Sequence, residues 1–86
     1  MTVYDLAKKL SEMYENAGDG EKTTMIHLFG IRYAEIIKDK KYSAADILGK
    51  TKLRNGKCMS NTYTTEIYKG IRLSRYVVEK QTEKNM

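Results

Sequence analysis

The chain has 86 residues, 41% of them hydrophobic, with a mean hydropathy of −0.62, a formal net charge of +5 and one cysteine, Cys58. These values favour one small globular domain over a disordered chain, and they exclude a disulfide framework and a cysteine-based zinc site. No apolar run approaches the roughly 20 residues that a membrane span needs, and the first residues lack the pattern of a signal peptide. We therefore expect a soluble cytoplasmic protein without a metal or cofactor.

The excess positive charge is confined to one block of the sequence. Residues 1–49 carry seven Lys/Arg and eight Asp/Glu, a net charge of −1, whereas residues 50–80 carry eight Lys/Arg and two Glu, a net charge of +6. A block of this kind predicts a polyanion as partner. The alternative interpretation is a solvated cationic face that serves solubility.

Apolar residues at three- and four-residue spacing predict an N-terminal helix over residues 2–17, capped by Thr2. A Gly-Asp-Gly segment follows, and a second, central helix is predicted over residues 22–39. That helix is apolar over most of its circumference, which is typical of a helix with partners on several sides. Gly30 within it would cost about 1 kcal/mol relative to Ala, which indicates a close helix crossing.

The third predicted helix begins at the cap Ser43 and covers residues 43–54, with an earlier end at Gly49 as the alternative. The segment that follows can be read in two ways. A loop is the favoured interpretation of residues 50–59, but Asn55-Gly56 is a strong signal for a small hairpin.

Ser60 caps a fourth predicted helix over residues 60–69, and Gly70 suits the left-handed position just after a helix end. A last helix is predicted over residues 72–80, and a frayed tail over residues 81–86. The predicted fold is therefore a single all-α domain, a four- to five-helix bundle over residues 1–86.

The order of the last elements predicts a helix-turn-helix. A short capped helix is followed by a helix with a polar start, then by Gly70 and arginines. Amide and hydroxyl side chains at the start of the second helix suit base edges, and cations suit phosphates. Residues 43–54 would then position the domain on DNA, and residues 60–69 would read the groove.

The stretch SNTYTTEIYKGIRL resembles the second helix of the Cro/phage-repressor type of helix-turn-helix. The segments HLFGIRYAEII, YSAADIL and YTTEIYKGIRLSRYV are similar to a small bacterial and archaeal helix-turn-helix-like domain that occurs alone and fused to restriction endonucleases. By position, the resemblance implies base reading by Asn61, Thr62 and Glu66, phosphate binding by Lys69 and Arg72, and a core position for Ile67. The segment LRNGKCM departs from the pattern because it lengthens the usual tight turn.

The resemblance and the charge block together give two sets of candidate DNA-binding residues. The base-reading candidates are Asn61, Thr62, Thr65 and Glu66; the phosphate candidates are Ser60, Lys50, Lys52, Arg54, Lys57, Lys69, Arg72 and Arg75. His27, alone on an apolar helix, is interpreted as a buried, hydrogen-bonded imidazole rather than a ligand.

The expected partner is double-stranded DNA, bound by a small prokaryotic transcriptional regulator or a restriction- or defence-associated protein. A homodimer on a palindromic site would double the reading surface. The apolar stripe of residues 2–17 is the candidate dimer contact, although packing of that stripe on the second helix is favoured. The alternative function is a helical protein-interaction module, an adaptor or antitoxin-like inhibitor, with an exposed stripe and an incidental basic face. We expect no enzyme, because no tuned carboxylate pair, phosphate loop or Ser/His/Asp set is present.

Overall fold

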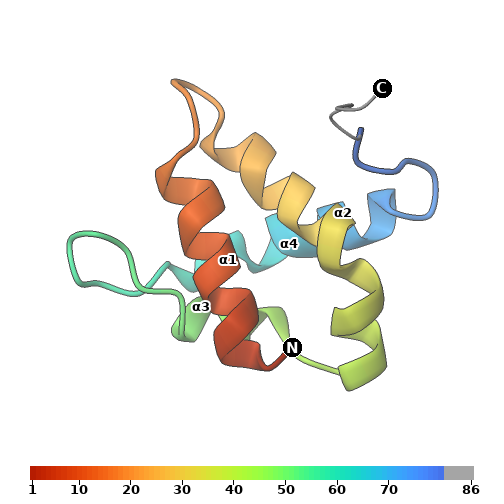
Figure 1. The fold of residues 1–86 in the computed structure, drawn as a ribbon, viewed down its shortest axis with the longest axis horizontal. Helices are drawn as coiled ribbons and strands as arrows, with labels where there is room; N and C mark the ends of the chain where they lie inside the picture. The colour runs from red at the N-terminus through yellow and green to blue at the C-terminus, as the bar shows by residue number, and fades with distance from the viewer. Residues whose placement is uncertain (81–86) are drawn as a thin grey trace, which may run out of the picture.

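The computed structural model describes residues 1–80; the predicted frayed tail lies outside them. Its elements are α1 (Val3–Glu15), α2 (Lys22–Lys40), α3 (Ala44–Gly49), the 3-10 turn η1 (Asn61–Tyr63) and α4 (Thr64–Leu73). In Figure 1, α1 and α2 lie in front and α4 crosses behind them. The predicted all-α class is confirmed, and the described residues contain only an isolated β-bridge. Within residues 1–80, no helix combines the length and the hydropathy needed to cross a membrane.

The apolar stripe of α1 packs into the core. The capping box starts the helix: Asp5 N donates to Thr2 Oγ1 over 3.1 Å, and Thr2 N donates to Asp5 Oδ2 over 2.8 Å. Leu6 and Leu10 are fully buried, and Met13 is nearly so. The stripe is therefore not free to form a dimer contact, and its packing against the other helices is the correct interpretation.

The crossing of α2 and α4 brings two glycines into contact. A Cβ on Gly30 would lie 2.6 Å from the carbonyl oxygen of Ile67 and 2.9 Å from Gly70 Cα. The close crossing predicted from Gly30 is thus confirmed. The prediction for Gly70 is wrong, because Gly70 lies inside α4 and allows the approach to α2 rather than ending the helix.

The predicted helix over residues 72–80 is also wrong. Its first two residues belong to the end of α4, the chain turns at residues 74–76, and residues 77–80 have no regular secondary structure. Ser74 closes the last turn of α4, since its Oγ donates to the carbonyl oxygen of Ile71. The remaining segment instead folds back onto α2.

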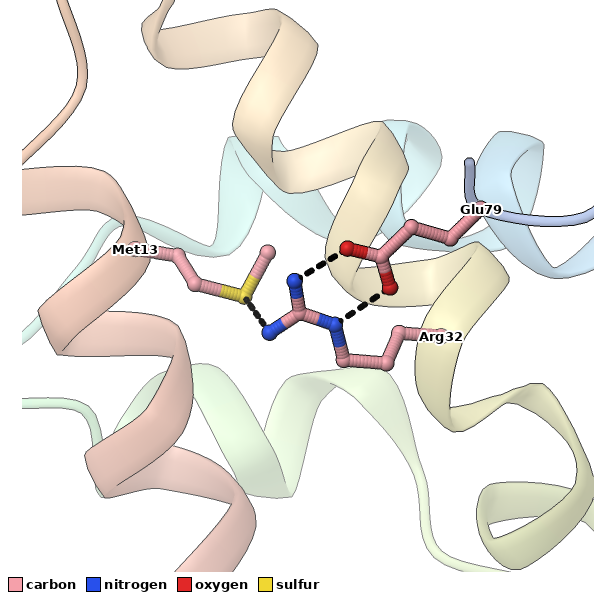
Figure 2. A network of polar contacts seen from close by, with 3 residues as sticks. All are labelled: Met13, Arg32 and Glu79. Carbon is pink, nitrogen blue, oxygen red and sulfur yellow. Dashed lines mark hydrogen bonds and ion pairs between the residues drawn. The ribbon is translucent and has the colours of Figure 1, made fainter. Parts of the chain in front are cut away.

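An ion pair holds this C-terminal segment (Figure 2). Arg32 on α2 donates to Glu79 through Nε over 2.7 Å and through Nη2 over 2.5 Å. The same guanidinium lies against the sulfur of Met13 on α1, at 3.6 Å. The hydrogen bonds with Arg32 hold the pKa of Glu79 below its usual value, and they raise the pKa of Arg32. Arg32 therefore joins α1, α2 and the segment that follows α4.

The link between α3 and α4 is a small hairpin. Helix α3 stops at Gly49, not at residue 54, and Lys52 forms an antiparallel bridge with Cys58. Leu53 N donates to the carbonyl oxygen of Lys57 over 2.9 Å, and Gly56 has a φ of +85°, which glycine adopts readily in tight turns. The loop favoured from the sequence is thus wrong, and the hairpin signal of Asn-Gly was correct.

The two ends of the hairpin lie next to each other, so the connection between α3 and the next helical segment is short. Thr51 is fully buried, and its Oγ1 donates to the carbonyl oxygen of Ile47 over 2.6 Å. Met59 N donates to the carbonyl oxygen of Thr51 over 3.0 Å, so the chain leaves and returns at one point. The direct link consists of residues 50, 51, 59 and 60, close to the usual turn of about three to four residues. In effect, the hairpin is inserted into a helix-turn-helix turn.

Candidate nucleic-acid interface

The exposed side of α4 carries a polar and cationic ridge, which we call the α4 ridge: Thr65, Lys69 and Arg72. Their spacing of four and three residues places them on one face of the helix. Ile67 and Ile71 are buried on the opposite face, as the core role implied for Ile67 requires. Core packing therefore orients the ridge toward solvent.

The start of this segment is organised by a cap. Ser60 Oγ accepts a hydrogen bond from Thr62 N over 3.1 Å, and the two hydroxyls lie 3.0 Å apart. Thr64 Oγ1 donates to the carbonyl oxygen of Asn61 over 2.7 Å. Asn61 and Thr62 are exposed just ahead of the α4 ridge. Ser60, a predicted phosphate contact, thus has a structural role as the cap of η1.

Glu66 contacts both α2 and Lys69 of the α4 ridge. Its Oε1 lies 2.6 Å from His27 Nε2, and its Oε2 lies 3.8 Å from Lys69 Nζ. The hydrogen bond with His27 is the main cause of the lowered pKa of Glu66. This carboxylate is hydrogen-bonded within the protein, so the predicted base reading by Glu66 would require the contact with His27 to open.

His27 is hydrogen-bonded as expected, but it is half-buried rather than buried. Sequence reasoning did not find its partner, because Glu66 lies 39 positions further along the chain. Among residues 1–80, no group of three or more His, Cys, Asp or Glu side chains is placed to hold a metal ion. The arrangement is a hydrogen-bonded contact between two helices.

Beside the α4 ridge lies a hollow of about 390 Å³, which we call the α2–α4 hollow. It is lined by His27, Lys69, Arg72, Leu73 and Tyr76. Leu73 and Tyr76 are exposed there, and both belong to the segment for which a helix over residues 72–80 was predicted. The predicted phosphate contacts Lys69 and Arg72 thus belong to the α4 ridge and to the hollow.

The remaining predicted phosphate contacts lie elsewhere. Lys50 and Lys52 line a shallow depression beside α1, together with Lys8, and Lys50 Nζ lies 5.6 Å from the ring centre of Tyr4. We call these three lysines the α1-side lysines. The cations of the predicted basic block therefore do not form one surface, because only some of them lie on α4.

Arg54, Lys57 and Arg75 occupy three further positions. Arg54 donates through its backbone N to Glu15 over 2.7 Å and through Nη2 to Asn16 over 3.3 Å, so its side chain is tied to the end of α1. Lys57 is exposed on the hairpin. Arg75 follows α4 and lines a depression against the second half of α2 rather than the α2–α4 hollow.

Comparison with known proteins gives a family assignment. No curated protein and no solved structure matches the chain. A family model described as an HTH-like domain matches residues 2–80, nearly the whole sequence. The match supports the resemblance to helix-turn-helix-like domains and leaves the Cro/phage-repressor type as a hypothesis. The chain belongs to the HTH-like domain family.

Proposed function

We propose that this protein binds double-stranded DNA through the α4 ridge. The observation that carries the proposal is an exposed row of one hydroxyl and two cationic side chains on the helix that follows α3 across a short direct link. In a helix-turn-helix, that second helix enters the major groove with its N-terminal residues toward the bases. Docking of the Cro/phage-repressor type would suit this order of elements.

The proposed roles follow from exposure and chemistry. Asn61, Thr62 and Thr65 read base edges, since amides and hydroxyls match the donors and acceptors of the major groove. Lys69 and Arg72 bind phosphates, which positions the helix without reading sequence. Glu66 is left out of this set because it is held by His27.

The α1-side lysines and the exposed Lys57 on the hairpin supply candidates for a second phosphate contact. In a helix-turn-helix the first helix crosses the DNA backbone, and α3 is followed at once by Lys50 and the hairpin. We therefore propose that cationic side chains of the hairpin bind phosphates in addition to those bound by α4.

The biological role we propose is that of a small sequence-specific regulator or a defence-associated DNA-binding protein. A homodimer on a palindromic site would double a small reading surface. Its contact would have to come from outside the α1 stripe, because Leu6 and Leu10 are fully buried. The same burial removes the support that an exposed stripe would have given to a protein-interaction module.

The test is fluorescence anisotropy of a labelled random duplex over a salt series. We expect binding that weakens steeply as salt rises, with log K falling by about 0.9 per neutralised phosphate for each unit of log salt concentration. The variant Lys69→Glu with Arg72→Glu should lose this binding while its circular dichroism spectrum is unchanged.

The matched control makes the same charge change elsewhere. Lys9 on α1 and Lys40 at the end of α2 are exposed and lie outside the residues proposed to bind DNA. The variant Lys9→Glu with Lys40→Glu should keep most of the affinity, apart from the long-range effect of net charge. A folded wild-type protein that fails to bind at low salt would refute the proposal, and equal losses in the two variants would refute the role of α4.

A further inference from the structure

Beyond its cations, the α4 end of the molecule exposes large apolar side chains. Tyr76 is 79% exposed and Leu73 is 41% exposed, and both line the α2–α4 hollow. Scattered exposed apolar residues are normal, but these two adjoin Lys69 and Arg72 in one concave site. The end of the α4 ridge thus carries one aromatic side chain, one aliphatic side chain and two cationic side chains.

The charge at the hollow favours an anionic occupant. Lys69 and Arg72 contribute two positive charges to its lining. Glu66 Oε2 lies 3.8 Å from Lys69 Nζ and offsets part of that charge, while the charge of Arg72 adds to the lining. An apolar surface rimmed by cations matches a nucleotide, whose sugar and base pack on aromatic side chains while its phosphate meets Lys or Arg.

We propose that Leu73 and Tyr76 form an apolar extension of the DNA contact. In this arrangement a nucleotide next to the segment read by α4 packs its sugar and exposed base edge against the two side chains. Lys69 and Arg72 hold the adjoining phosphates. The inference rests on the proposed DNA binding and adds a contact that carries no charge.

Duplex DNA is the occupant to which the geometry points, because the hollow and the α4 ridge share Lys69 and Arg72. DNA docked on the ridge would therefore reach the hollow without any movement of the helices. An acidic peptide with aromatic residues would satisfy the same charges, but it would compete with DNA for the shared cations. The two occupants can be separated by experiment.

The proposal predicts that loss of an apolar side chain lowers the affinity for DNA without changing its salt dependence. Loss of a cationic side chain should change the salt dependence. Replacing Tyr76 by Ala removes packing but no charge, so the salt slope should stay the same while affinity falls by roughly 3- to 10-fold. This loss is smaller than that for a ring stacked on an unpaired base, because the paired bases of a duplex expose only their edges. Replacing Arg72 by Ala should instead reduce the magnitude of the slope by about 0.9. A general loss of structure would not give this division.

The experiment compares salt series for the wild-type protein and for Tyr76→Ala, Tyr76→Phe and Arg72→Ala on one labelled duplex. Val78 gives a control, since it is 86% exposed and lines a separate depression against α2 rather than the hollow. We expect Tyr76→Phe and Val78→Ala to bind nearly as the wild type does, and Tyr76→Ala to bind more weakly with an unchanged slope.

Three results would overturn the inference. Wild-type affinity of Tyr76→Ala would show that the ring does not touch DNA, although DNA binding itself would stand. Binding of a Glu-Tyr copolymer that Tyr76→Ala abolishes, together with unaffected DNA binding, would reassign the hollow to a protein partner. Absence of wild-type DNA binding at low salt would overturn this inference and the proposed function together.

Discussion

Replacing Gly30 by Ala should destabilise the protein strongly, although Ala is the better helix former. The new Cβ would lie 2.6 Å from the carbonyl oxygen of Ile67 and 2.9 Å from both Gly70 Cα and Ile71 N. These three atoms belong to the backbone of α4, so no side chain can rotate away to relieve the contact. The two helices would have to separate, which would disturb the packing of the whole core.

The expected magnitude is the difference between two effects. An extra methyl group in a well-packed contact typically costs about 1–3 kcal/mol, and contact with three backbone atoms puts this site toward the upper end. Replacing Gly by Ala in a helix interior stabilises the helix by about 1 kcal/mol. The net loss is therefore about 2 kcal/mol, which for a domain of this size corresponds to a Tm lower by roughly 8–16 °C.

Thermal unfolding followed by circular dichroism measures this loss, with Gly49→Ala as the matched control. Gly49 is the last residue of α3, and no atom lies within 4 Å of the Cβ that it would gain. That variant should be neutral or slightly stabilising. A Tm of Gly30→Ala equal to or above that of Gly49→Ala would show that the helices do not cross as closely as the structure has them.

Three further predictions concern single polar contacts. Thr51→Val keeps the shape of a buried side chain but removes its hydrogen bond to α3, so urea unfolding should show a loss of about 1 kcal/mol. Glu79→Gln weakens the half-exposed ion pair with Arg32; we expect at most about 1 kcal/mol, less in high salt, and faster amide exchange in the C-terminal segment. Because the hydrogen bond with His27 lowers the pKa of Glu66, its stabilisation is present above the ordinary value of 4.5 and is lost as the pH falls through the lower folded value. A Tm series from pH 3 to 7 should therefore show a smaller acid-induced decrease for Glu66→Gln, and equal curves would contradict the assignment.

The local features of the fold could be predicted from the sequence because their causes are local. Thr2, Ser43 and Ser60 act as caps where the residue types predicted them, since a cap depends on contacts two or three residues apart. The central position of α2 followed from its apolar circumference. Gly30 was correctly associated with a crossing, because a glycine inside a helix is costly unless close packing requires it.

The errors arose where distant segments decide the structure. Gly70 has the sequence context of a helix end, but contact with Gly30, 40 positions away, keeps it within α4. Glu66 matched a base-reading position, but His27 holds its carboxylate. Tyr76 belonged to the helix predicted over residues 72–80, but it lies in the turn after α4. For Gly70 and Glu66, the deciding partner belongs to another part of the chain.

The inserted hairpin explains how α3 and α4 can form a helix-turn-helix although the sequence between them is long. The link looked too long because sequence spacing counts every residue, whereas the relation of α3 to α4 depends on where the chain leaves and returns. Buried Thr51 and Met59 fix that point through the bond of 3.0 Å between their backbone atoms. Residues 52–58 can then vary without moving α4, because the helices are held by the core and by the glycine crossing. An insertion at this place adds the cations Lys52 and Lys57 next to the helix that would lie across the DNA backbone, and it leaves the α4 ridge as it was. The hairpin would thus add phosphate contacts to those of Lys69 and Arg72 without changing the residues proposed to read bases.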